Sequence, residues 1–296
     1  MTLPLYRIRP VIPPKNPRLP AAPVEYDQRF IDATLSILRQ YFNTIDNFAQ
    51  SFTDTYGGAY LQFPYGAFHQ NGATTLSVGI TNVSTTPIQV ADTSGFPSSG
   101  WLLIDSEIIS YTTKTATTFD GTVTRGVLGT TNVAHSAGAN ITEVQGTGGA
   151  TSIGQMLFNN TDYSNGVAVD STDQTKIVLT NSGIYNIQFS AQLLNFTTTE
   201  DNVTIWIRKN GSDVAASAGV VEVAPKHGGS PGATISSWNY FLDMVAGDYF
   251  QLVWTSDTGN TVVASYPAST VAPVHPLSPG VILTVQFVSA NFPPVT

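Results

Sequence analysis

The sequence contains no cysteine, which excludes disulfide bonds, thiolate nucleophiles and thiolate metal ligands. Charge is also scarce: Asp, Glu, Lys and Arg make up 11% of the 296 residues, under half of the usual share of about 25%. The surface must therefore be formed largely by Ser, Thr, Asn, Gln and Gly. This composition is typical of β proteins that work outside a cell, whereas disordered chains normally carry more charge.

Long apolar runs are missing as well. None approaches the ~18 residues of a membrane span, and no apolar signal-peptide core follows Met1. The formal net charge is −8, which gives no electrostatic reason to expect nucleic acid or an anionic membrane as a partner. We therefore expect neither a membrane nor a nucleic acid among the partners.

The clearest strand signal lies in residues 181–193. After a Gly-containing turn, apolar residues alternate with amides and serine. Successive side chains of a strand point to opposite faces, so this stretch predicts one apolar and one amide-rich face. The apolar face comprises Tyr185, Ile187, Phe189, Ala191 and Leu193. Further short apolar segments at regular spacing predict a sandwich or a barrel.

Residues 1–24 are rich in proline, which excludes helix and central strands. The only charges before Glu25 are basic and belong to Arg7, Arg9, Lys15 and Arg18. We predict an extended arm that anchors the protein on an acidic partner surface. A disordered tail is the alternative.

Residues 25–56 are predicted to form a coiled-coil helix. Apolar residues recur there at alternating spacings of four and three, which is the pattern of an oligomerisation seam. The seam comprises Ile31, Leu35, Leu38, Phe42, Ile45, Ala49 and Phe52. Large residues at the a positions disfavour a dimer, and a helix this short is marginal alone in water. The alternative is one amphipathic helix packed on its own chain.

The rest of the chain divides into a connector (57–82), a small β-module (83–145), a Gly/Thr-rich hinge (146–152) and a larger β domain (153–296). In the connector, Phe63, Tyr65 and Phe68 are predicted to pack under the helix bundle. In the larger domain, residues 249–254 are apolar on both strand faces and need cover on both sides. The facing sheet would bury one side of this strand. The other side would be buried either by a neighbouring subunit or, if the strand is central in a monomeric sandwich, by its own chain.

The module resembles a unit that recurs in tail and fibre proteins of bacterial viruses. The shared order is Gly-Phe-Pro, a strand, Glu-Ile-Ile-x-Tyr, Arg-Gly, Gly-Thr and His-x-x-Gly. These motifs lie at residues 95–97, 107–111, 125–126, 129–130 and 135–138.

The larger domain resembles the trimeric jelly roll of the tumour-necrosis-factor and complement family, in the version found in structural proteins of cyanobacterial viruses. The resemblance is carried by Gly-Ile-Tyr-x-Ile-x-Phe-Ser-Ala, Trp-Ile-Arg-Lys-Asn-Gly and Ala-Gly-Asp-Tyr-Phe-Gln-Leu, at residues 183–191, 206–211 and 246–252. The phrase Phe-Pro-Tyr-Gly-Ala-Phe at 63–68 also resembles those proteins, where it directly precedes the jelly roll. The module is then an insertion, and the resemblance implies a trimer around a three-fold axis.

The predicted fold is therefore mainly β: a C-terminal jelly-roll β-sandwich, a small inserted β-module and an N-terminal coiled-coil helix with an extended Pro-rich arm. The expected function is that of a non-enzymatic structural protein of a bacteriophage virion. It would be a homotrimeric fibre or knob that binds other virion proteins, of the tail, baseplate or capsid, and a host-surface glycan. The alternatives are a capsid decoration without a receptor role and a carbohydrate-binding module.

The sequence offers few candidates for chemistry. Asp105 and Glu107 have the i, i+2 spacing that puts two carboxylates on one strand face, which a polysaccharide depolymerase would need; acids exposed at a strand end are the favoured interpretation. Two acidic pairs in predicted loops could bind calcium, but solvated acids are favoured there too. These pairs are Asp170 with Asp173 and Glu200 with Asp201. We expect no catalytic residue, no metal and no cofactor.

Histidines and exposed aromatic residues are further candidates for ligand contact. The histidines lack metal-ligand spacing and are each expected at a turn or on the surface; they are His69, His135, His227 and His275. Trp101 and Trp238 are aromatic candidates for ligand contact, although Trp238 is expected in the core. His227 and Tyr266 lie in predicted loops and are the chosen candidates for ligand contact.

Overall fold

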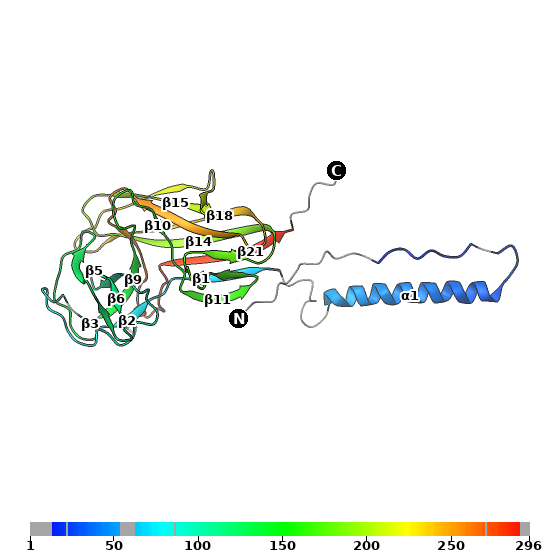
Figure 1. Cartoon of the computed structure of the whole chain (residues 1–296), viewed down its shortest axis with the longest axis horizontal. Helices are drawn as coiled ribbons and strands as arrows, with labels where there is room; N and C mark the ends of the chain where they lie inside the picture. The colour runs from blue at the N-terminus through cyan, green and yellow to red at the C-terminus, as the bar shows by residue number, and fades with distance from the viewer. Residues whose placement is uncertain (1–13, 22, 54–62, 86, 270, 291–296) are drawn as a thin grey trace. The chain divides into compact units, whose positions relative to one another are not determined.

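The structure is a computed structural model that describes residues 14–21, 23–53, 63–85, 87–269 and 271–290. The chain forms two compact units, residues 1–63 and residues 64–296. The described residues make one helix and twenty-one strands (Figure 1). The prediction of a mainly β protein is confirmed, whereas the jelly roll and the coiled coil stay predictions.

The first unit contains α1 (Gln28–Thr53), which begins three residues after the predicted start at residue 25; residues 54–56 of the predicted helix lie outside the described residues. It begins at Gln28 because Asp27 caps it: Asp27 Oδ1 accepts a hydrogen bond from the Arg29 backbone amide at 2.9 Å. The described residues include no helix with the length and apolar character needed to cross a membrane.

Within the first unit, the predicted seam of α1 is partly exposed. Its large exposed members are Ile31, Leu35 and Phe42, at 38%, 45% and 57%. Leu38 and Ile45 are half-buried, and Ala49 is exposed. The Phe52 side chain lies outside the described part of the structure. Both interpretations of this face, an oligomerisation seam and a helix packed on its own chain, stay predictions.

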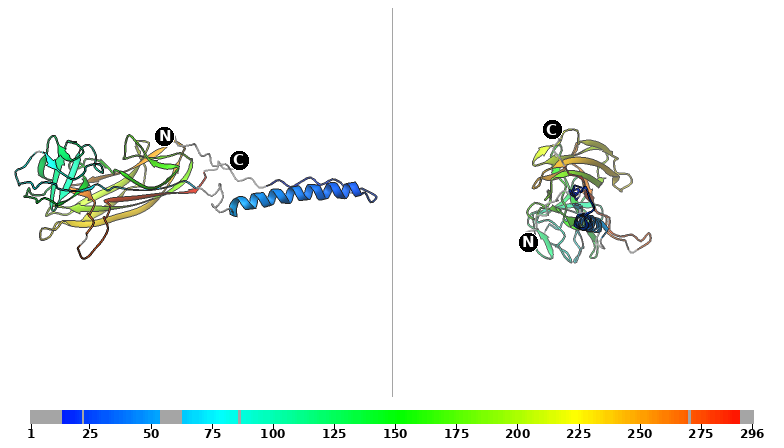
Figure 2. Two further views of the ribbon diagram at one scale, coloured as in Figure 1. Left: turned by 90° about the horizontal axis from the view of Figure 1, so that it is seen from below. Right: turned by 90° about the vertical axis from the view of Figure 1, so that its right-hand side faces the viewer.

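The arm runs beside α1 where the structure describes it (Figures 1 and 2). Residues 14–21 are extended, and the Tyr41 hydroxyl donates a hydrogen bond to Asn16 Oδ1 at 3.3 Å. Among the predicted anchoring residues, Lys15 and Arg18 are exposed, and Arg7 and Arg9 lie outside the described residues.

In the second unit, the strand predicted at residues 181–193 is β14 (Gly183–Asn195). It pairs antiparallel with β18 (Gly232–Met244) on one edge and with β21 (Val281–Ser289) on the other. The five predicted core residues of its apolar face are all buried, and the amides between them are half-buried or exposed. The predicted apolar face of this strand is confirmed.

A second antiparallel sheet faces the first across one shared core, the sandwich core. Its strands are β10 (Gly154–Gln155), β12 (Val167–Val169), β13 (Ile177–Leu179), β15 (Asp201–Lys209), β16 (Ser212–Asp213), β17 (Gly219–Val223) and β19 (Tyr249–Ser256). β19 is central, and both of its faces, including Gln251 and Val253, are buried within the single chain. Its two apolar faces therefore need no cover from a neighbouring subunit.

The connector supplies a strand of the sandwich. β1 (Tyr65–His69) pairs with β11 (Asn160–Asn165), and the Phe287 amide donates to the Pro64 carbonyl at 2.9 Å. Phe68 is fully buried in the sandwich core, so the prediction that it packs under the helix bundle is wrong. Strand alternation turns Phe68 inward, whereas Tyr65 is 46% exposed.

The module has its own core, which lies between a three-stranded sheet and part of a nine-stranded sheet. The small sheet contains β3 (Ile88–Gln89), β6 (Thr113–Lys114) and β7 (Thr118–Asp120). The module strands of the large sheet are β2 (Ala73–Thr75), β4 (Gly100–Ile104), β5 (Glu107–Tyr111), β8 (Thr124–Val127) and β9 (Asn140–Gln145). The first of them, β2, lies before residue 83, where the module was predicted to begin.

β20 (Thr261–Ala264) joins the module to the sandwich. It pairs with β14 and with β9, which makes one continuous nine-stranded sheet. The module and the sandwich therefore lie in one compact unit. Residues 146–152, which were predicted to form a hinge, do not separate them into two units. Pro64 is bonded to Phe287, which pairs with Tyr185 near the start of β14. β20 pairs with the other end of β14, at Leu193 to Asn195. The module therefore lies at the opposite end of the unit, roughly 30 Å along the strand from Pro64 (Figure 1).

Candidate functional site

The outer face of this joined sheet carries a third apolar cluster, the junction core. It comprises Ile108, Val144, Leu194, Phe196, Val262 and Ala264. Strand alternation explains its position, since Leu193 and Val263 point into the sandwich core while Leu194 and Val262 point to the other face. At the junction the sheet is thus apolar on both faces.

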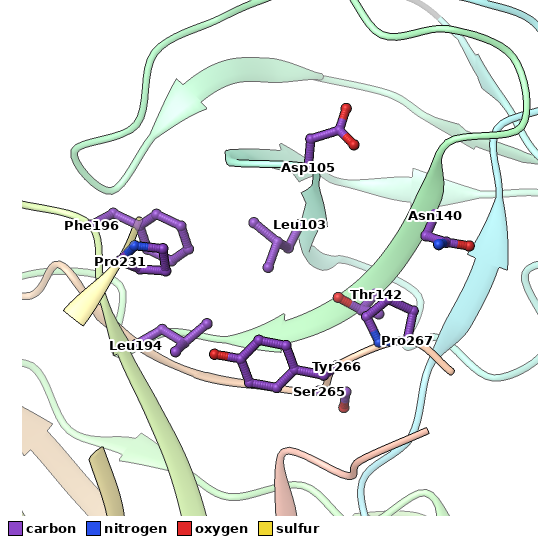
Figure 3. A pocket seen from close by; sticks show the side chains of 10 residues that line it. All are labelled: Leu103, Asp105, Asn140, Thr142, Leu194, Phe196, Pro231, Ser265, Tyr266 and Pro267. Carbon is purple, nitrogen blue, oxygen red and sulfur yellow. The ribbon is translucent and has the colours of Figure 1, made fainter. Parts of the chain in front are cut away.

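An open pocket of about 240 Å³ lies over the junction core, and we name it the junction pocket (Figure 3). Its apolar wall comprises Leu103, Leu194, Phe196, Pro231 and Pro267. Its other lining residues are Asp105, Asn140, Thr142, Ser265 and Tyr266. The pocket therefore draws on both the module and the sandwich and requires their junction.

The strand register brings the polar lining residues together. Thr142 of β9 pairs with Leu103 of β4, so the two side chains share a face of the sheet. Asn140 lies two residues before Thr142 on the same strand, and thus on the same face. Tyr266 follows β20, where its backbone exchanges two hydrogen bonds with that of Ser278.

Three polar side chains of the pocket have no hydrogen-bond partner among the described residues. They are Asn140, whose amide is exposed, Tyr266, which is half-buried, and Thr142, which is only 2% exposed. Partial burial raises the pKa of the Tyr266 hydroxyl, so this group is a hydrogen-bond donor at neutral pH. The Thr142 hydroxyl is not a fully buried orphan atom: it remains accessible in the pocket wall, where water or a ligand can complete its hydrogen bonds.

Asp105 is held at the pocket rim by a histidine. It lies in the two-residue turn between β4 and β5 with φ of 54°, a conformation that Asp tolerates better than most residues. His135 Nδ1 lies 2.7 Å from Asp105 Oδ2, and His135 Nε2 lies 2.9 Å from Glu107 Oε2. His135 therefore bridges the carboxyl groups of Asp105 and Glu107 through its two ring nitrogens.

Glu107 is the centre of this arrangement, the Glu107 network (Asp105, Glu107, Arg125 and His135). Arg125 holds its carboxylate with two hydrogen bonds, Nε to Oε1 at 2.7 Å and Nη2 to Oε2 at 2.8 Å. The backbone amides of Gly126 and Val133 also donate to it. Burial alone would raise the pKa of Glu107, but hydrogen bonds from Arg125, Val133 and His135 outweigh it and lower the pKa.

Two predictions about these residues are wrong. Glu107 is fully buried and Asp105 lies in the turn, so they are neither paired carboxylates on a strand face nor two acids exposed at a strand end. His135 was expected at a turn or on the surface, and it is 4% exposed. The sequence did contain a signal, because Glu107, Arg125 and His135 all belong to the order of short motifs that was singled out in residues 95–138.

The two residues predicted to contact a ligand, Tyr266 and His227, lie at different places in the structure. Tyr266 lines the junction pocket, whereas His227 lies in an exposed tight turn, where its backbone bonds to that of Ser230. Trp101 packs against the junction core without lining the pocket. Trp238, expected in the core, is partly buried: it packs edge-on against Phe189 at 4.7 Å between ring centres and lies against the sandwich core.

Three of the four acids named as calcium candidates accept hydrogen bonds from their own chain, and Glu200 is exposed. Asp170 and Asp173 accept hydrogen bonds from Thr172 and Thr175 within tight turns. Asp201 was expected to be solvated, and it is 1% exposed; Ser256, Thr258 and Thr261 donate to its carboxylate. Within the described ranges, no three His, Cys, Asp or Glu side chains are placed to hold one metal ion.

No model of a known protein family matches the chain, and no curated protein matches it either.

Proposed function

We propose that this protein is a trimeric structural component of a bacteriophage virion. In this proposal, residues 1–24 dock on other virion proteins and α1 joins three copies. The sandwich is a jelly roll of the tumour-necrosis-factor and complement type, and the β unit is presented outward as a fibre or knob. The protein acts without catalysis, at the host surface.

The observation that carries the proposal is the exposed seam of α1. Exposed apolar side chains on one helix face favour association, because burial contributes about 25 cal/mol for each Å² removed from water. Their spacings of four and three are those that interlocking helices require. The basic residues Lys15 and Arg18, which are exposed, leave the arm available to an acidic surface.

The arrangement within the β unit supports outward display. The module and the junction pocket lie at the end of the unit remote from Pro64, where the chain enters from the helix. A ligand site at that end suits attachment, and it favours a receptor role over capsid decoration without one. A free carbohydrate-binding module is the second candidate, since the pocket alone would serve it.

Labelling of intact virus particles tests the proposal. Antibodies raised against residues 64–296 should decorate projections on particles purified from an infected culture. Mass spectrometry of the same particles should find the full chain. A protein that is present in the lysate but absent from washed particles would contradict the virion role and leave the free binding module as the better account.

A further inference from the structure

We propose that the junction pocket binds one neutral pyranose sugar residue of a host-surface glycan, an inference that rests on the proposed role in attachment. The pocket is not lined by apolar groups alone: Thr142, a residue only 2% exposed, is in its wall, and the Thr142 hydroxyl has no partner among the described residues. Asn140 and Tyr266 add two more unpartnered polar groups. An apolar ligand would leave all three desolvated and unpaired, at a cost in affinity.

The chemistry of these groups matches sugar hydroxyls. A threonine hydroxyl, a side-chain amide and a tyrosine hydroxyl can each donate to or accept from a hydroxyl, and Asp105 can accept from one. The rings of Tyr266 and Phe196 supply apolar surface for the C–H face of a pyranose (Figure 3). Such a mixture of a mainly apolar wall and a few convergent polar groups is usual for small-molecule sites.

The charge of the lining residues favours a neutral ligand over an anionic one. The residues that line the pocket include no Lys, Arg or His, and the carboxylate of Asp105 is at its rim. An anionic ligand, such as a phosphate, a sulfated sugar or a sugar acid, would meet repulsion and no counter-charge. The volume of about 240 Å³ lies below the roughly 300–1,000 Å³ of drug-sized sites, which fits one ring.

The Glu107 network positions Asp105 for this role. His135 holds one oxygen of the Asp105 carboxylate, Glu107 holds His135, and Arg125 holds Glu107. The other oxygen of Asp105 is left for a ligand. Since Asp105 also has an unusual backbone conformation, the turn and the network together fix the carboxylate at the rim.

The test is saturation-transfer NMR on the full-length protein with D-glucose, D-galactose, D-mannose and N-acetyl-D-glucosamine as separate probes. A single ring in an open pocket should bind with a Kd on the order of 1 mM. At least one probe should show transfer, and D-glucuronate should show none. Absence of transfer from all four neutral sugars, or equal transfer from glucuronate, overturns the inference.

Two variants locate the binding. Asn140→Ala removes an exposed side chain with no partner, and Thr142→Val removes one hydroxyl at constant shape. Each should weaken binding about fivefold to tenfold. Thr204→Val, on the opposing sheet, is the matched control and should bind as the original protein does. Unchanged binding in Asn140→Ala overturns the assignment even if the Thr142 variant fails to fold.

The same samples separate this inference from the proposed assembly. Their molar mass in solution is measured alongside binding. A trimer that binds no neutral sugar contradicts the pocket assignment alone. A monomer that binds the sugar, and loses it in Asn140→Ala, supports the pocket and contradicts the trimer.

Discussion

Arg125 and Glu107 form a buried ion pair whose partners depend on one another. Their side chains are 5% and 0% exposed, and the guanidinium also donates to the backbone carbonyls of Thr81, Ser84 and Val133. Removing the guanidinium would leave a buried carboxylate without its cation, which typically costs about 3–5 kcal/mol. The pair therefore ties the turns of the module to its sheet.

We expect Arg125→Met to lower the free energy of unfolding by about that amount, as measured by denaturant titration near pH 7 at fixed protein concentration. Arg208→Met is the matched control, because the Asp213 side chain that pairs with Arg208 is 56% exposed. Pairs of this kind contribute under about 1 kcal/mol. Equal effects of the two changes would contradict the structural role of the network.

Because of Glu143, we expect an unusual pH dependence of the free energy of unfolding. It is 2% exposed, and burial raises its pKa to about 7, although a hydrogen bond from Asn159 opposes the shift. Its ordinary pKa is 4.5, so the folded state holds a proton that the unfolded state releases between those values. The free energy of unfolding should therefore fall as pH rises from about 4.5 to 7, by roughly 3 kcal/mol from this group.

Glu143→Gln isolates that contribution, because a neutral amide of similar shape has no proton to lose. The variant and the original protein should have similar stability near pH 4.5, and the variant should be the more stable by roughly 3 kcal/mol at pH 8. Unfolding curves of both proteins across this range measure the difference, in which all other groups cancel. A difference that does not change with pH would contradict the buried, proton-binding state of Glu143.

For single residues, the sequence predicted burial correctly where it depends on a local pattern and failed where it depends on distant partners. The five core residues of β14 were found because alternation is a local pattern. The buried roles of Glu107, His135 and Asp201 were missed because their partners lie 18 to 60 residues away in the chain. Tyr266 was chosen as a loop aromatic, but Thr142 and Asn140 could not be, since nothing local marks a strand residue as facing a pocket.

Among the elements, β1 shows most clearly what long-range pairing adds. Its partner β11 lies beyond the whole module, so no local pattern predicted that the connector is a strand. The resemblance drawn from the sequence did imply this place, because it puts the phrase around Phe68 directly before the jelly roll. Chain order within the sandwich is thus consistent with the module as an insertion.

Phe68→Ala should therefore destabilise the β unit rather than the helix. A fully buried phenylalanine costs about 3–5 kcal/mol when it is truncated to alanine. Tyr65→Ala, on the exposed side of the same strand, should cost under about 1 kcal/mol. Thermal unfolding followed by near-ultraviolet circular dichroism distinguishes the two, and an unchanged midpoint in Phe68→Ala would contradict its place in the core.

At the scale of the whole molecule, residues 64–296 form one compact unit, whereas the sequence predicted a module and a larger domain joined by a hinge. The residues 146–152 have the Gly and Thr composition of a hinge, yet β20 bridges the module and the sandwich by pairing on both sides. That bridge comes from a strand more than one hundred residues later, which composition cannot reveal. The junction core and its pocket exist only because of it.

The central claim is that the seam of α1 joins three copies of the chain. Multi-angle light scattering of the full-length protein at micromolar concentration tests it most directly. The proposal predicts a molar mass three times the 31.5 kDa of one chain. It also predicts a shift to the single-chain mass when Leu35 and Phe42 are both changed to glutamate. A stable single-chain mass for the unaltered protein would contradict the claim.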